Sequence, residues 1–363
     1  MTVSEKRPSD LDILEQYRNV EEILKVLAPI LLKLEIAGDL VEFHMFTAIQ
    51  WPRLRSLQFA NHMPYRDIIP MPQVVSKMPL LETLGYNFHT SAESRDPEIL
   101  CYERGASETA HCASLRSVVP DLKSLSISNV KADDTIIEQL PEGLETLRVS
   151  ALRDPCREAR MSLHGGGKCC QYNPLDRFEA LRWIEAASKL SSLQELALAL
   201  KEPPSPTLLA EVVSACPQLR VLELQQARFE KSNNKSLYTL VNHVDSVFGS
   251  ALAHPLNSQE SLVEPLKNLR HLRDLRITIG LGIHNPPALR RGTWNYPDIT
   301  SWHDIMNMGH FFAARLPSLT SLSFSYHNPG LQYSIRRHSM WKRMSINRGD
   351  AGKPPYALFD RFL

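Results

Sequence analysis

The stretch Pro317-Ser-Leu319-Thr-Ser-Leu322-Ser-Phe324 carries the pattern that decides the fold of this chain. Written as P-x-L-x-x-L-x-Φ, where Φ is an apolar residue, it places the second leucine and Φ two residues apart. Two residues at that spacing point to the same face of a β-strand. The proline cannot continue a helix, so it ends one element and begins an extended segment. Each copy therefore predicts a strand with one buried face.

The pattern recurs along most of the chain, which is typical of a repeat protein. The second leucines of the copies are Leu34, Leu57, Leu84, Leu125, Leu147, Leu196, Leu222, Leu275 and Leu322. Several gaps between them match the period of leucine-rich repeats, about 20–29 residues, and the longer gaps are close to doubled repeats or carry insertions. The segments between copies have helical periodicity, clearest at 11–28, 133–140, 176–190, 208–216 and 301–316.

Strands of this kind, each followed by a helix, stack into a parallel ladder. We therefore predict an α/β fold, a leucine-rich-repeat solenoid (horseshoe) with a parallel β-sheet on the concave face and helices on the convex face. Residues 1–28 are expected to form a tail and a capping helix, 29–346 the irregular repeats, and 347–363 a C-terminal tail. Within the last repeats, 331–347 is expected to be a degenerate repeat or an edge strand.

At these residues the chain resembles the leucine-rich-repeat family, in the irregular form found in the substrate-binding half of fungal F-box proteins. The resemblance covers about residues 29–346. It implies a substrate receptor of a cullin ubiquitin ligase, in which the repeats capture the substrate and an N-terminal F-box binds a Skp-type adaptor. No L-P-x-E-φ-φ run precedes Leu31, however, and only the helix at 11–28 is expected there.

A second departure concerns the position eight residues after the first leucine of each copy, where the family usually has asparagine or cysteine. The nine copies show Asp39, His62, His89, Val130, Leu152, Lys201, Ala227, Gly280 and His327 at this position. No asparagine ladder is expected.

Composition excludes several classes of function. The chain has 41 basic and 40 acidic side chains and a net charge of +1, so no global field would draw it to nucleic acid or to an anionic membrane. No run approaches the roughly 18 apolar residues of a membrane span, and the N-terminus has no apolar signal region. The cysteines, expected to be free thiols in a cytoplasmic or nuclear protein, are Cys101, Cys112, Cys156, Cys169, Cys170 and Cys216.

The predicted strands leave alternate side chains facing away from the core, and many of these are small and neutral. The charged ones in the middle and C-terminal part are Arg148, Glu195, Glu223, Asp274 and Arg276. One interpretation is a solvated face on which neighbouring strands pair opposite charges. The other is a docking surface for a protein partner.

Insertions at 87–106, 151–174 and 280–300 all follow a strand and precede a helix, so they are expected at one rim of the solenoid. The last of them carries Arg290, Arg291, Trp294 and Tyr296. Residues of these types dominate protein-binding hot spots. The alternative is an ordered loop whose aromatic side chains pack on the flank of the solenoid.

No pattern points to catalysis, a metal or a cofactor. The run HGGG at 164–167 resembles an oxyanion-hole motif, but no G-x-S-x-G nucleophile elbow accompanies it. Cys156, His164, Cys169 and Cys170 lack the spacing of a zinc site.

A basic cluster lies near the C-terminus, and it contains Arg336, Arg337, Lys342, Arg343 and Arg348, with Tyr333 and Trp341 nearby. It indicates either a charged edge strand that resists aggregation or a site for nucleic acid or an acidic peptide. The neutral charge of the whole chain argues against nucleic acid as the main partner.

These observations favour a non-enzymatic protein–protein interaction module that binds its partner with the concave face and the rim loops. The resemblance favours an F-box-like substrate receptor within this class. The alternatives are a scaffold protein unrelated to ubiquitin ligases, or an enzyme with a site in the rim loops.

Overall fold

A computed structural model describes residues 10–64, 69–89, 114–132, 134–152, 174–227, 255–278, 299–326, 340–348 and 356–359. The chain divides into two compact units. The first unit consists of residues 1–174 and 186–193, and the second of residues 175–185 and 194–363. Helix α6 (Arg177–Ser188) passes from one unit to the other.

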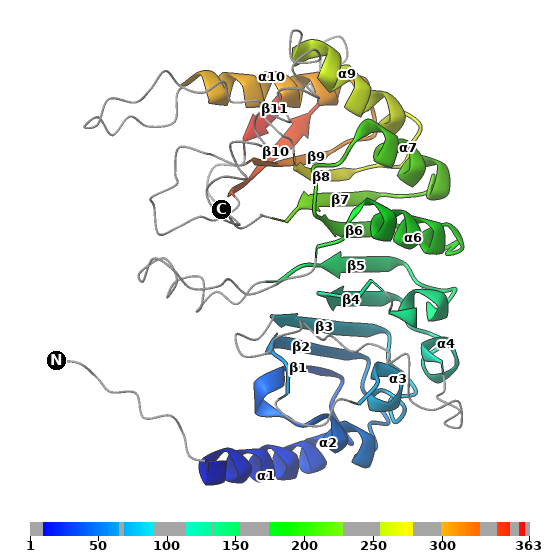
Figure 1. Ribbon diagram of the computed structural model, residues 1–363, viewed down its shortest axis with the longest axis vertical. Helices are drawn as coiled ribbons and strands as arrows, with labels where there is room; N and C mark the ends of the chain where they lie inside the picture. The colour runs from blue at the N-terminus through cyan, green and yellow to red at the C-terminus, as the bar shows by residue number, and fades with distance from the viewer. Residues whose placement is uncertain are drawn as a thin grey trace, which may run out of the picture. The chain divides into compact units, whose positions relative to one another are not determined.

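The first unit has parallel strands that lie in chain order (Figure 1). Its elements are α1 (Asp10–Leu27), β1 (Lys33–Ala37), the 3₁₀ helix η1 (Gly38–Leu40), α2 (Phe43–Ala48), β2 (Ser56–His62), α3 (Met71–Val74), β3 (Thr83–His89), α4 (Leu115–Val118), β4 (Ser124–Ser128), the 3₁₀ helix η2 (Thr135–Gln139) and β5 (Thr146–Ser150). The strand register places the second leucine of each copy beside the next, from Leu34 to Leu147. The register predicted from the repeat is confirmed in this unit.

The second unit repeats the arrangement and then changes direction. Its elements are α6, β6 (Glu195–Leu200), α7 (Pro206–Ala215), β7 (Val221–Gln226), α9 (Pro255–Leu266), β8 (Asp274–Thr278), α10 (Ile299–Arg315), β9 (Ser321–Tyr326), β10 (Met340–Asn347) and β11 (Tyr356–Phe359). Strands β6 to β9 are parallel and keep Leu196, Leu222 and Leu275 in register with Leu322. Strands β10 and β11 are antiparallel additions.

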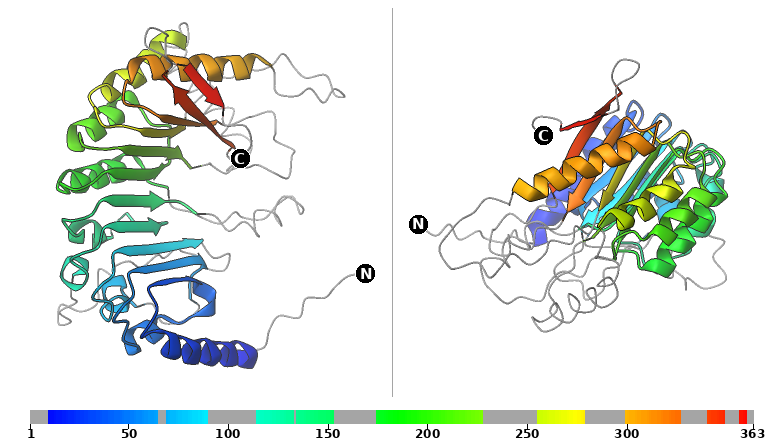
Figure 2. Two further views of the ribbon diagram at one scale, coloured as in Figure 1. Left: turned by 180° about the vertical axis from the view of Figure 1, so that it is seen from behind. Right: turned by 90° about the horizontal axis from the view of Figure 1, so that it is seen from above.

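The leucines and Φ residues point to one face of each sheet, and this face forms the core. Leu57, Leu125, Leu222 and Leu275 are fully buried. Helices α2, α3 and α4 in the first unit and α6, α7 and α9 in the second lie along one side of the strands of their unit, whereas α1 lies at the end of the first unit (Figures 1 and 2). In the second unit the ring of Phe312 from α10 packs edge-to-face on Phe324, with centroids 5.7 Å apart. An α/β fold with a mostly parallel sheet is therefore confirmed, and we call the opposite face of the strands the outward face.

Backbone hydrogen bonds tie each repeat to the next just before the strands begin. The carbonyl of Arg55 accepts from the amides of Glu82 and Thr83, at 2.8 and 2.9 Å. The carbonyl of Arg220 accepts in the same way from Arg273 and Asp274, at 2.8 and 3.1 Å. This edge, which we call the strand-start rim, is formed by Arg55, Glu82, Lys123 and Glu145 in the first unit and by Gln194, Arg220, Arg273 and Thr320 in the second.

A buried asparagine joins successive repeats in the first unit. Asn129 has a left-handed backbone, with φ of 52°. Its Nδ2 donates to the carbonyls of Phe88 and Leu152, at 3.0 and 2.9 Å, and its Oδ1 accepts from the amide of Leu152 at 3.2 Å. The leucine spacing places Val130 where the family usually has asparagine, whereas the residue that bridges the repeats, Asn129, lies one position earlier.

The two ends of the chain differ in part from expectation. Helix α1 buries Tyr17 and Leu24, and Ala28 directly after the helix is also buried, whereas Ile23 and Val26 are exposed. At the other end, β10 pairs antiparallel with β9, with Met344 opposite Leu322, so it is a strand of reversed direction instead of a further parallel repeat. Strand β11 pairs with the far side of β10 and lies in the segment expected to be a tail.

Candidate functional site

The outward face of β6 to β9 holds most of the charged residues singled out in the sequence. Because side chains alternate along a strand, each strand contributes every second residue to this face. The outward residues are Glu195, Ala197 and Ala199 on β6, Val221, Glu223 and Gln225 on β7, Asp274, Arg276 and Thr278 on β8, and Ser321, Ser323 and Ser325 on β9.

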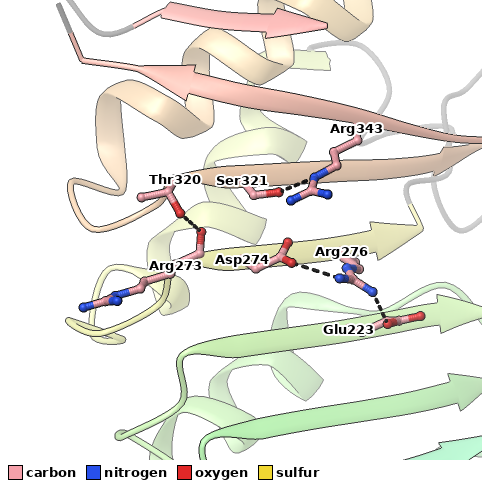
Figure 3. Close-up of polar contacts among 7 residues, drawn as sticks. All are labelled: Glu223, Arg273, Asp274, Arg276, Thr320, Ser321 and Arg343. Atoms are coloured by element: carbon pink, nitrogen blue, oxygen red, sulfur yellow. Dashed lines mark hydrogen bonds and ion pairs between the residues drawn. The ribbon is translucent and has the colours of Figure 1, made fainter. Parts of the chain in front are cut away.

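An ion-pair cluster occupies the middle of this face (Figure 3). Arg276 donates from Nη2 to Oδ2 of Asp274 at 3.0 Å, and from Nη1 to Oε2 of Glu223 at 3.3 Å. Burial of the guanidinium acts to lower the pKa of Arg276, but Asp274, Glu223 and Glu195 together more than offset it and raise that pKa. The interpretation that neighbouring strands pair opposite charges is confirmed for this group.

Arg276 donates to only one oxygen of the Asp274 carboxylate. Oδ1 of Asp274 is buried and receives no hydrogen bond from the described residues. A buried carboxylate oxygen without a donor is energetically costly. Three acidic side chains, those of Asp274, Glu223 and Glu195, lie close enough to Arg276 to raise its pKa.

Short side chains lie beside the cluster on the neighbouring strands β6 and β9. Ala197, Ala199, Ser321 and Ser323 are buried although they point outward. Ser323 lies between Arg276 and Arg343 in the strand register. Nε of Arg343 donates to Oγ of Ser321 at 3.2 Å, so the antiparallel strand β10 adds a second guanidinium to this face (Figure 3).

Other predicted site residues lie elsewhere. Arg148 is on the outward face of β5 in the first unit, beside Ser126 in the register. Arg290, Arg291, Trp294 and Tyr296 fall outside the described residues, as do the run at 164–167 and the cysteines other than Cys216. Cys216 is a buried free thiol, as expected, and its burial raises its pKa to about 11.

Two features of this region were not predicted from the leucine spacing. Arg343 joins the outward face because β10 runs antiparallel, a direction that the leucine spacing does not encode. The second feature is the set of arginines on the strand-start rim, Arg220 and Arg273. They occupy the same position of two successive repeats, and an alignment of the copies by their leucines would have revealed them.

Within the described ranges, no group of three or more His, Cys, Asp or Glu residues could hold a metal ion. None of the described helices combines the length and the apolar character needed to cross a bilayer. No known protein family matches the sequence. A comparison with curated proteins also finds no match.

Proposed function

We propose that this chain is a leucine-rich-repeat protein that binds a protein partner on the outward face of β6 to β9, the concave face of the predicted horseshoe. The observation that carries the proposal is the ion-pair cluster, in which Oδ1 of Asp274 is buried and has no donor among the described residues.

The chemistry of the cluster selects the group that the partner would present. A lysine or arginine side chain would donate a charge-assisted hydrogen bond to the carboxylate of Asp274. Such charge-assisted bonds between partly buried groups set specificity, because a partner without the cation leaves the carboxylate unpaired.

Substitution of the carboxylate tests the proposal with little change of shape. The full-length chain is immobilised as wild type, Asp274→Asn and Asp121→Asn, and captured proteins are quantified by mass spectrometry. Asp121 is exposed on a turn of the first unit, so it serves as the control. We expect a protein that the wild type and the control capture equally but that Asp274→Asn captures about tenfold less, a loss of roughly 1.4 kcal/mol. Equal capture by all three would contradict the proposal.

Within this class we propose a substrate receptor of a cullin ubiquitin ligase, supported by the resemblance of residues 29–346 to the repeat half of fungal F-box proteins. A pull-down of the full chain with a purified Skp-type adaptor tests this role separately. Absence of adaptor binding would leave a scaffold protein unrelated to ubiquitin ligases as the role. An enzyme remains the least supported alternative, because its suggestive run at 164–167 lacks the nucleophile motif that the chemistry requires.

A further inference from the structure

The order of charged side chains along the strand-start rim differs between the two units. In the first unit the four rim residues alternate in sign along successive repeats: Arg55, Glu82, Lys123 and Glu145. Arg55 and Glu82 form an ion pair. Alternation of this kind is what neighbouring strands favour, because like charges side by side are destabilising.

The second unit places two arginines next to each other on this rim. Arg220 and Arg273 are joined by the backbone hydrogen bond from the amide of Arg273 to the carbonyl of Arg220, at 2.8 Å. Both are exposed, and neither forms an ion pair with a described residue. The side chain of Arg273 turns away from the Asp274–Arg276 cluster (Figure 3), so the outward face does not neutralise it.

Two further arginines extend this basic edge. Arg348 follows the end of the antiparallel strand β10 and donates from Nη2 to the carbonyls of Leu316 and Leu319, at 2.7 and 2.8 Å. These carbonyls belong to the turn that leads into Thr320 on the rim. Arg270 is exposed in the turn that leads into Arg273.

Two carboxylates of helix α9 are engaged by other cations. Glu264 pairs with Lys267, and Glu260 pairs with Arg315 at 3.6 Å. Four guanidinium groups thus share one rim without a carboxylate partner in the described part of the chain. We call Arg220, Arg270, Arg273 and Arg348 the arginine rim.

We propose that the arginine rim binds an acidic peptide segment, with glutamate or aspartate side chains accepting from the guanidinium groups. Arginine suits this task because its planar guanidinium can engage a carboxylate through two parallel hydrogen bonds. The rim residues advance by one strand spacing, about 4.8 Å, per repeat, so long arginine side chains can reach successive carboxylates of an extended chain. The acidic segment removes the repulsion between Arg220 and Arg273.

A peptide fits these residues better than nucleic acid does. The chain has a net charge of +1, so it lacks the broad positive field that draws a phosphate backbone. The four residues of the rim also include no aromatic ring on which a base could stack. The proposal is independent of the outward face, because the arginine rim and the Asp274 cluster use different side chains.

Fluorescence anisotropy of a labelled oligoglutamate peptide, measured with the full chain at low salt, tests the proposal. The variants are Arg220→Gln/Arg273→Gln and the matched control Arg55→Gln/Lys123→Gln, which removes two cations from the same rim positions of the first unit. We expect the first to weaken binding by about tenfold or more and the control by less than about twofold. Thermal melting should show that Arg220→Gln/Arg273→Gln is no less stable than wild type, because it removes a repulsive pair.

Three results would overturn the proposal: no peptide binding by the wild type, equal weakening by both double variants, or tighter binding of a single-stranded DNA of equal charge. Asp274→Asn should not weaken peptide binding. A loss of binding in that variant would show that the peptide occupies the outward face instead, which also overturns the assignment to the rim.

Discussion

At the scale of single residues, the most informative side chain is a buried amide. Asn129 accepts from one neighbouring segment and donates to two, and it does so from a left-handed backbone that asparagine tolerates better than most residues. The side chain thereby satisfies the carbonyl of Phe88 at the end of β3 and both backbone groups of Leu152 after β5. One residue links three successive strands of the first unit.

Replacement of this residue should be strongly destabilising. We expect Asn129→Ala to lower the free energy of unfolding by about 2–4 kcal/mol, because it removes three hydrogen bonds, leaves the half-buried backbone of Leu152 without its side-chain partner and strains a positive φ. Asn129→Gly should cost about 1 kcal/mol less, since glycine adopts this backbone without strain. Urea unfolding followed by circular dichroism measures both. A change below about 0.5 kcal/mol for the alanine variant would show that these bonds contribute little.

Cys216 provides a pH-dependent contribution to stability. Its pKa is raised by burial from 9.0 to about 11, so the folded thiol stays protonated where the unfolded thiol ionises. Stability should therefore be unaffected below the unfolded pKa and fall as the pH rises toward the folded pKa. We expect a loss of about 2–3 kcal/mol over this window that Cys216→Ala lacks. Unfolding curves of both proteins across this pH range test it, and parallel pH profiles would contradict it.

At the scale of elements, the two faces of a strand have separate roles. Leu222 is fully buried and aligned with Leu196 and Leu275, whereas its neighbour Val221 points outward and is half-buried. On β8 the outward residues Asp274 and Arg276 are likewise half-buried, whereas on β6 and β9 short outward residues such as Ala197 and Ser323 are buried as well. Packing of the core therefore depends on the leucine face of each strand, and any binding of a partner depends on the outward face.

A pair of alanine variants on β7 separates these roles. We expect Leu222→Ala to lower the free energy of unfolding by about 2–5 kcal/mol, because it leaves a cavity in the core. Val221→Ala should cost less than about 1 kcal/mol. Chemical denaturation measures the difference, and similar costs for the two variants would contradict the assignment of faces.

The regular elements could be predicted because their signals are local and repeated. Leucine spacing fixes which residues share a ladder, and helical periodicity indicates α6, α7 and α10 to within a few residues. Helices α2, α3 and α4 could not be predicted, since four to six residues are too few to show a period. The direction of β10 and the pairing of β11 depend on contacts between distant segments, about which residue spacing carries no information.

At the scale of the whole molecule, each unit packs one face of its strands and leaves the other for contact. Cross-strand charge pairing at Arg276 followed from the predicted register, because residues at equal positions in adjacent repeats become neighbours. The contributions of Arg343 and Arg348 did not follow, because β10 brings them to the outward face and the rim by running antiparallel. At this scale we propose that Asp274 and its neighbours on the outward face bind a protein partner.

Site-directed photo-crosslinking tests that claim most directly. A photoreactive amino acid is placed at Gln225 on the outward face of β7 or, as the control, at the exposed Glu211 on α7, and crosslinked products from cells that produce the chain are identified by mass spectrometry. We predict a discrete crosslinked protein from position 225 that Asp274→Asn reduces, and no such product from position 211. A partner crosslinked from position 211 but not from position 225 would contradict the account.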